Sequence, residues 1–322
     1  MRSWRFTVTK ILIDCDPGHD DAVALLFAAR HLDLVGITTV HGNSSLENTT
    51  HNALALMELG GLDIPVACGC AAPLVGNATF APHIHGKSGL DGATLPQPSL
   101  KLVDAHAVDF IIDQAERHRG ELVVAVIGPQ TNLALALRRE PRLAQWLREI
   151  TVMGGSTTTG NVTPAAEFNI YCDPEAAAAV FASGIPVRMV GLNVTRRTGF
   201  TSADVDRLRS SSRRVAGVIA DLLAFYLARQ RESFGLDLAP MHDVCAIIPY
   251  AFPDLIRYGQ TTVQVELGGA LTRGMTVCDL RAFHPGTRLP AQLAQDGHVQ
   301  VALEAESRLL IDRVIETILA YP

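Results

Sequence analysis

The chain has 322 residues, of which 48% are hydrophobic, and a formal net charge of −6. This length buries a core easily and no break in composition divides it, so we expect a single domain over residues 1–322. Acidic and basic residues are mixed throughout, without a basic stripe or a polybasic tail. This mixture argues against a nucleic-acid or membrane partner and favours chemistry on a small molecule.

The six cysteines are scattered without a C-x-x-C pair. This spacing argues against a zinc cluster and against a disulfide framework, and it favours reduced thiols. No apolar stretch reaches membrane-spanning length without polar, Gly or Pro interruption. We therefore expect a cytoplasmic protein.

Short β-branched runs alternate along the chain with longer amphipathic stretches. The first part predicts strands and helices in turn, at 10–14 (strand), from about 21 (helix), 34–40 (strand), 45–59 (helix), around 65–67 (strand), 103–118 (helix) and 121–127 (strand). An irregular stretch rich in Pro, Gly and His occupies about 70–100, and a loop of that length in a compact domain is usually functional.

The same alternation continues through the second half of the chain. It predicts a helix at 131–139, a strand at 149–155, a helix at 173–183, a strand at 186–192, helices at 203–210, at 214–232 and from about 241, β-like runs at 261–267 and 298–303, and a final helix at 305–320. Near-continuous apolar strands indicate a parallel sheet covered on both faces. The predicted fold is α/β: an open, doubly wound, mostly parallel sheet flanked by helices, with antiparallel additions near the C-terminus.

Four aspartates follow the first predicted strand within eight residues: Asp14, Asp16, Asp20 and Asp21. Asp20 and Asp21 could simply cap the next helix, where acidic residues are favoured. Asp14 and Asp16 lie outside that explanation. Because carboxylates a few ångströms apart repel one another, the run predicts a site for a hard cation, Ca²⁺ or Mg²⁺.

Polar residues also follow the other predicted strands. They are His41-Gly42-Asn43, Gly128-Pro129-Gln130-Thr131-Asn132, Met153-Gly154-Gly155 and Asn193. Each group alone could be turn chemistry. In a doubly wound sheet, however, ligands bind outside the carboxyl ends of the strands, so these groups predict one site at that edge.

Six segments in this order resemble the inosine–uridine nucleoside hydrolase family, and the match runs over nearly the whole chain. They are DCDPGHDDA (14–22), VHGN (40–43), IHGKSGLDG (84–92), GPQTNLA (128–134), MGGSTTTGNVTPAAEFNIYCDPEAA (153–177) and MHD (241–243). The fold of that family is an open α/β sheet, as the strand and helix pattern indicates independently.

The resemblance implies a Ca²⁺ ion held by Asp16, Asp21, the main-chain carbonyl of Thr131 and Asp243, together with the ribose 2′- and 3′-hydroxyls and a water. It further implies a ribonucleoside substrate and a homodimer or homotetramer. The side chains that would bind the ribose hydroxyls are Asp20, Asn43, Asn161, Glu167 and Asn169, and Met153 and Phe168 would line the sugar and base pocket.

Hydrolysis of an N-ribosidic bond passes through an oxocarbenium-like state. We assign Asp16 as the general base on a calcium-bound water and expect inversion at the anomeric carbon. His242, beside Asp243, is the candidate to protonate the leaving base, since histidine titrates near neutrality. The alternative for His242 is an ordinary helix residue.

Three further positions near the motifs are less informative. His85 resembles a substrate-covering position of the family, although its neighbour His83 shows that a histidine in this loop need not be functional. His19 receives no role, and Asp14 is expected to orient the ligands rather than to be one.

The segment 228–243 resembles the pyrimidine-preferring members of the family. Gln230 would then meet the base and Phe234 would lie beside it, at a position where a Tyr can occur in the family. The missing hydroxyl leaves uridine, cytidine and inosine all open as substrates. Tyr226 and Arg229 lie on the same predicted helix, where a solvated face is the commoner arrangement.

Two rival functions remain at this point. An Asp-x-Asp motif after a first strand also occurs in haloacid-dehalogenase-like, Mg²⁺-dependent phosphatases, with Asp14 as nucleophile and Asp16 as acid. Those enzymes need a lysine near a later strand end, whereas Lys87 and Lys101 belong to the loop region. The second rival is a non-catalytic ribonucleoside-binding protein that keeps the pocket without the chemistry.

Overall fold

The computed structural model describes residues 8–283 and 297–322. An eight-stranded sheet forms its centre, in the order β3-β2-β1-β4-β5-β6-β12-β9. Its strands are β1 (Lys10–Cys15), β2 (Asp33–Thr39), β3 (Val66–Cys68), β4 (Val123–Val126), β5 (Glu149–Met153), β6 (Val187–Val190), β9 (Ile256–Thr261) and β12 (Val299–Ala305). All neighbours are parallel except β12 and β9, which confirms the predicted open, mostly parallel sheet with an antiparallel addition near the C-terminus.

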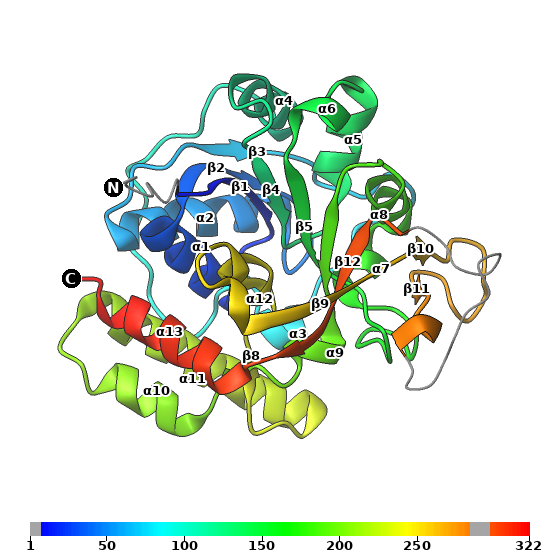
Figure 1. Ribbon diagram of the computed structural model, residues 1–322. Helices are drawn as coiled ribbons and strands as arrows, with labels where there is room; N and C mark the ends of the chain where they lie inside the picture. The colour runs from blue at the N-terminus through cyan, green and yellow to red at the C-terminus, as the bar shows by residue number, and fades with distance from the viewer. Residues whose placement is uncertain (1–7, 284–296) are drawn as a thin grey trace, which may run out of the picture.

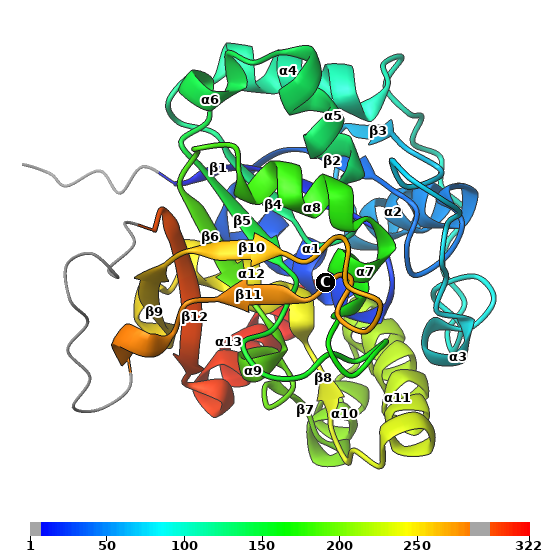
Figure 2. The ribbon, with the colours of Figure 1, turned by 90° about the vertical axis from the view of Figure 1, so that its right-hand side faces the viewer.

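Helices cover both faces of this sheet (Figures 1 and 2). Successive residues of β1 point to opposite faces: Ile11 and Ile13 belong to one buried cluster and Leu12 to the other. The first cluster is shared with α1 (His19–His31), α2 (Leu46–Gly60), α11 (Arg214–Phe234), α12 (His242–Ile247) and α13 (Ser307–Leu319). The second cluster is shared with α4 (Ala107–Arg117), α5 (Thr131–Arg139), α6 (Leu143–Trp146) and α8 (Pro174–Phe181).

Local sequence signals set several helix ends. Ser45 caps α2, its hydroxyl accepting from the Asn48 N–H at 3.4 Å, and the helix stops at Gly61, whose φ of +62° is left-handed. Gly235 ends α11 in the same way, with φ +66°. Asp173 caps α8 by accepting from the Ala176 N–H at 3.0 Å. Such caps satisfy backbone groups that a helix leaves unpaired at its ends.

The remaining elements are short. They are α3 (Pro82–His85), α7 (Phe168–Cys172), α9 (Leu192–Thr195), α10 (Ser202–Arg209), the strand pairs β7 (Gly199–Phe200) with β8 (Ala239–Pro240) and β10 (Val263–Val265) with β11 (Thr276–Cys278), and the 3₁₀ turns η1 (Ile248–Tyr250), η2 (Pro253–Leu255) and η3 (Arg281–Phe283). Of these, α3 interrupts the predicted irregular stretch 70–100. No helix among the described residues is both long enough and apolar enough to cross a membrane.

Several predicted boundaries were wrong by a few residues. The helix predicted from about 21 begins at His19, and the one predicted at 103–118 begins at Ala107. The strands predicted at 149–155 and 186–192 end at Met153 and Val190, where the chain turns into polar loops. These loops lie at the carboxyl edge of the sheet and carry the residues described next.

Candidate active site

The site lies where the strand order reverses. From β1 the chain winds outward through β2 and β3 on one side, and β4 to β6 lie on the other side. The loops after β1 and β4 therefore diverge and leave a crevice at the carboxyl edge, which is the place where doubly wound sheets bind ligands. Of the groups predicted at the strand ends, Asn43 and Met153 line the cavity at this crevice, whereas the Asn193 amide donates to the Ala302 carbonyl at 2.9 Å.

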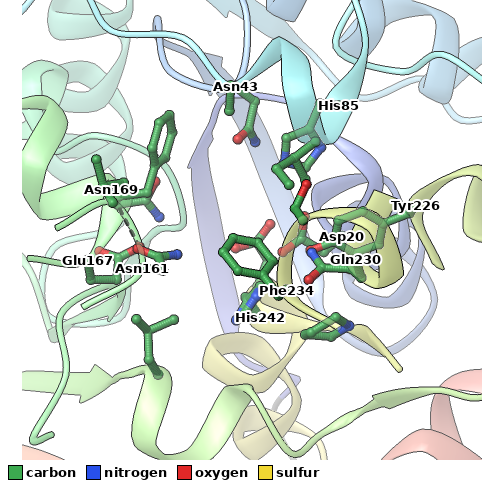
Figure 3. A pocket seen from close by; sticks show the side chains of 18 of the residues that line it. Asp20, Asn43, His85, Asn161, Glu167, Asn169, Tyr226, Gln230, Phe234 and His242 are labelled. Atoms are coloured by element: carbon green, nitrogen blue, oxygen red, sulfur yellow. Dashed lines mark hydrogen bonds between the residues drawn. The ribbon is translucent and has the colours of Figure 1, made fainter. Parts of the chain in front are cut away.

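A cavity of about 650 Å³ opens at this crevice. Every residue predicted to bind substrate lines it: Asp20, Asn43, His85, Met153, Asn161, Glu167, Phe168, Asn169, Gln230 and Phe234. His242 and Asp243 line it as well, whereas Asp16, Asp21 and Thr131 are buried and do not line it. Figure 3 shows Asn161, Glu167 and Asn169 on one side of the cavity and Tyr226, Gln230 and Phe234 on the other.

Asp20, Asp21 and Asp243 form a buried acidic cluster in which one oxygen of each lies within 4.8 Å of the others. Burial, followed by repulsion from Asp21, raises the pKa of Asp20 to about 8. Burial raises the pKa of Asp21 to about 6, and burial together with Asp20 and Asp21 raises the pKa of Asp243 well above its usual value. Three buried carboxylates this close need either protons or a cation.

Asp16 lies beside this cluster and is completely buried. Its Oδ2 accepts from the Asn43 N–H at 2.6 Å, and its Oδ1 has no hydrogen-bond partner in the described part of the chain. Glycines enclose it on both sides, since a Cβ on Gly42 would lie 2.0 Å from Oδ2 and one on Gly128 2.5 Å from Oδ1. Burial and repulsion from Asp21 raise the pKa of Asp16 well above its usual value.

The donor set fits a hard cation. It consists of carboxylate oxygens, and the unpartnered Oδ1 of Asp16 is a buried acceptor of the kind that a metal satisfies. The acidic cluster contains Asp20, which the family resemblance assigns to ribose rather than to the ion. Asp21 is fixed in place by the Gly18 N–H at 2.9 Å and the Asn43 amide at 3.2 Å.

Asp14 and Thr131 make contacts away from the cavity. Asp14 Oδ1 accepts from the Thr38 hydroxyl at 2.6 Å and from the Asn132 amide at 2.8 Å. Burial raises the pKa of Asp14 to about 7, and the two hydrogen bonds partly oppose that effect. The Thr131 hydroxyl donates to Asp173 Oδ2 at 2.7 Å, which fixes the first residue of α5.

Glu167 and Asn169 shape the opposite wall. The Glu167 carboxylate caps α7, accepting from the Asn169 N–H at 3.0 Å, and it also accepts from the Gly155 N–H at 3.0 Å. Burial raises the pKa of Glu167 to about 6, against the lowering effect of these hydrogen bonds. The Asn169 amide donates to the Ile127 carbonyl at 2.8 Å, which ties α7 to the end of β4. Both side chains are buried.

His242 opens α12, and its Nδ1 lies 2.7 Å from the Thr195 hydroxyl. Burial, with a smaller contribution from Arg196, lowers its pKa to about 4. The expectation that His242 titrates near neutrality was therefore wrong, because a deeply buried imidazole loses hydration that its charged form requires. Burial likewise lowers the pKa of His85 well below the usual value. Both His83 and His85 line the cavity.

Tyr226 and Arg196 are among the lining residues that sequence reasoning missed. Tyr226 is 2% exposed and faces the cavity, so the expected solvated face was wrong for this residue. Its spacing of four residues from Gln230 could have placed both on one helix face. Arg196, after α9, donates to the Thr159 hydroxyl at 2.8 Å and to the Gly160 carbonyl, beside Asn161. No motif or period in the sequence indicated it.

Known proteins resemble the chain in sequence and fold. The family model described as "Inosine-uridine preferring nucleoside hydrolase" matches residues 11–311. A pyrimidine-specific ribonucleoside hydrolase RihA from Enterobacter sp. (strain 638) is 41% identical over 301 residues, which cover 91% of this chain and 96% of the relative.

Two solved structures of nucleoside hydrolases have the same fold. A purine-preferring ribonucleoside hydrolase from Gardnerella vaginalis superposes with a TM-score of 0.89 at 30% identity, covering 97% of this chain and 99% of that one. A plant nucleoside hydrolase, PpNRh1, gives a TM-score of 0.88 at 32% identity over the same shares.

Proposed function

The chain belongs to the inosine-uridine preferring nucleoside hydrolase family and is thus an N-glycosyl hydrolase, and we propose that it hydrolyses pyrimidine ribonucleosides, uridine and cytidine ahead of inosine, to ribose and free base. The observation that carries this choice is Gln230, whose amide offers both a donor and an acceptor at the cavity wall. Similarity to the pyrimidine-specific RihA supports it. The phosphatase alternative is ruled out by the family membership.

The proposed cofactor is Ca²⁺, held by Asp16, Asp21, Asp243 and the main-chain carbonyl of Thr131. The unpartnered buried oxygen of Asp16 and the acidic cluster beside it support this assignment. When bound, the ion would neutralise the carboxylates, lower the pKa of a neighbouring water and hold the ribose diol.

Asp16 is the proposed general base. The Asn43 N–H orients its carboxylate by donating to Oδ2 at 2.6 Å. The carboxylate takes the proton of the attacking water. Attack on the face of the sugar opposite the departing base inverts the anomeric carbon.

The remaining assignments concern binding. We assign the ribose hydroxyls to Asp20, Asn43, Asn161, Glu167 and Asn169, which bring acceptors and donors to one cavity. Met153 and Phe168 pack against sugar and base, Gln230 and Phe234 contact the base, and His85 covers the substrate. We propose that His242, whose Nδ1 is held by the Thr195 hydroxyl, gives the departing base its proton from Nε2. A site built for these hydroxyls makes deoxyribonucleosides poor substrates.

The proposed assembly is a homodimer or homotetramer in the cytoplasm, on the strength of the family resemblance alone. Light scattering on the purified protein gives its mass and tests this directly.

A substrate panel tests the proposed function. We expect kcat/KM for uridine and cytidine to exceed that for inosine and adenosine, since Gln230 matches the polar edge of a pyrimidine. Calorimetric binding of uridine without ribose release over hours would favour the non-catalytic alternative. Higher kcat/KM for inosine than for uridine would contradict the pyrimidine assignment.

A further inference from the structure

The segment 156–166 connects β5 to α7 and lines the cavity with Asn161 and Val162. It folds back on itself, because the Ala166 carbonyl accepts from the Asn161 N–H at 3.1 Å and from the Val162 N–H at 3.3 Å. Gly160 lies where this turn closes, since an added Cβ there would stand 2.2 Å from the Ala166 carbonyl oxygen. The position of Asn161 therefore follows that of Gly160.

The Asn161 side chain carries an acceptor that the protein does not use. Its Oδ1 is buried and has no hydrogen-bond partner among the described residues. The side chain lies on the same side of the cavity as Glu167 and Asn169 (Figure 3). A buried acceptor needs a donor to offset its lost hydration, and a sugar hydroxyl is such a donor.

Arg196 holds the middle of this segment from a different part of the fold. It directly follows α9, and its guanidinium donates to the Thr159 hydroxyl at 2.8 Å and to the Gly160 carbonyl, 36 residues away in sequence. The start of the segment has a separate tie, because the Ser156 N–H donates to the Thr276 hydroxyl at 2.9 Å. Arg196 therefore joins the loop after β5 to the loop after β6 at the level of Asn161.

We propose that Arg196 is a positioning residue, which holds Gly160 and thereby fixes Asn161 with its Oδ1 available to a ribose hydroxyl of the substrate. The inference deepens the proposed function and rests on it for the identity of the ligand. The planar guanidinium reaches both partners at once. A lysine ammonium on a flexible stem does not reproduce that fork, although it carries the same charge.

Two other roles for Arg196 make different predictions. Arg196 itself lines the cavity, so one alternative is direct contact with the substrate. Its effect would then be independent of Asn161. The other alternative is an action through positive charge alone on His242, whose pKa Arg196 helps to lower. Lysine at position 196 would preserve that action.

Hydrogen–deuterium exchange tests the anchor without reference to activity. R196M keeps a long side chain without donors, and R197M changes the exposed neighbouring arginine as the control. We expect the backbone amides of the peptide 156–166 to exchange about tenfold faster in R196M than in the wild type or R197M. Unchanged exchange in R196M would overturn the proposal, even for a protein that hydrolyses uridine normally.

Steady-state kinetics with uridine at saturating Ca²⁺ test the consequence for binding. We expect R196M and R196K each to raise KM by about three- to tenfold, the effect of one hydrogen bond, with kcat changed by less than about twofold. The hydroxyl that Asn161 binds is not broken in the reaction, so its loss affects binding. A lower kcat at unchanged KM would indicate general damage, and wild-type behaviour of R196K would indicate charge; either result would overturn the proposal.

A double-mutant cycle with N161A tests whether Arg196 acts through Asn161. The double variant R196M/N161A should have a KM within about twofold of N161A alone, because the residue that Arg196 positions is already gone. Additive effects, or an unchanged KM in N161A, would overturn the inference. Absence of ribose release by the wild type, together with faster exchange in R196M, would instead count against the proposed function and leave the anchor in place.

Discussion

At the scale of single residues, the proposed mechanism depends most on Asp16. Its Oδ1 is a buried acceptor without a partner in the described residues, and a side chain at position 42 or 128 would collide with its carboxylate. We expect D16N, assayed with saturating Ca²⁺ and uridine, to lower kcat by about 10²- to 10⁴-fold, since an amide cannot take the proton. The exposed substitution D63N is the control. A kcat of D16N within tenfold of the wild type would contradict the assignment.

Glu167 makes the free energy of unfolding depend on pH. Its pKa rises from 4.5 unfolded to about 6 folded, because burial outweighs its hydrogen bonds. The folded state therefore holds this proton more tightly than the unfolded state does. The protonated Glu167 adds to the free energy of unfolding below pH 4.5, and this stabilisation is lost as pH rises through about 6. In urea unfolding with a chelator, the wild type should lose about 2 kcal/mol relative to E167Q between pH 4 and 7.

The control for this measurement is E232Q, which changes an exposed carboxylate on α11. Its free energy of unfolding should follow the wild type at every pH. A constant difference between E167Q and the wild type across the range would show that Glu167 has an ordinary pKa.

Short motifs predicted part of the cavity lining, and longer-range packing decided the rest. Asp20, Asn43 and Glu167 follow strand ends or stand in family motifs, and each lines the cavity as expected. Arg196 was missed because its contacts with Thr159 and Gly160 join segments about 36 residues apart. The pKa of His242 was misjudged because burial depends on the whole fold rather than on its neighbours in the chain.

At the scale of elements, α11 determines the base side of the cavity. Tyr226, Gln230 and Phe234 follow one another at intervals of four residues and so lie along one helix face. Phe234, the last residue of α11, is 45% exposed at the cavity mouth, where an added hydroxyl has room.

We expect F234Y to raise the ratio of kcat/KM for uridine over inosine by about three- to tenfold, the effect of one added hydrogen bond to a pyrimidine. The matched control is F252Y, which adds the same hydroxyl beside His31. Phe252 is the residue that precedes η2. An unchanged ratio in F234Y would show that the ring contacts the base through packing alone.

The long helices were predictable, whereas the short helices α7 and α9 were not. The helix of α11 has 21 residues and shows its period plainly, but α7 and α9 have only five and four. One turn carries no period, and α7 exists because Glu167 caps it and Asn169 ties it to β4. Strand β9 was missed because its pairing partner, β12, lies about 40 residues further along the chain.

At the scale of the whole molecule, the sheet order explains where the site lies. The reversal between β1 and β4 brings Asp16, the Asn43 loop and Thr131 to one crevice, although they are far apart in sequence. The alternation of strands and helices predicted this architecture. The single domain over residues 1–322 stays a prediction, since residues 1–7 and 284–296 lie outside the described part.

We propose that the acidic cluster holds a cation on which activity depends, and the central claim is that this cation is Ca²⁺. The most direct test is ribose release from uridine by protein treated with a calcium chelator and then supplied with Ca²⁺, with Mg²⁺ as the comparison. We expect activity to be lost with the chelator and restored by Ca²⁺ far better than by Mg²⁺, which is smaller and holds its waters more firmly. Full activity in the chelated protein would contradict the claim.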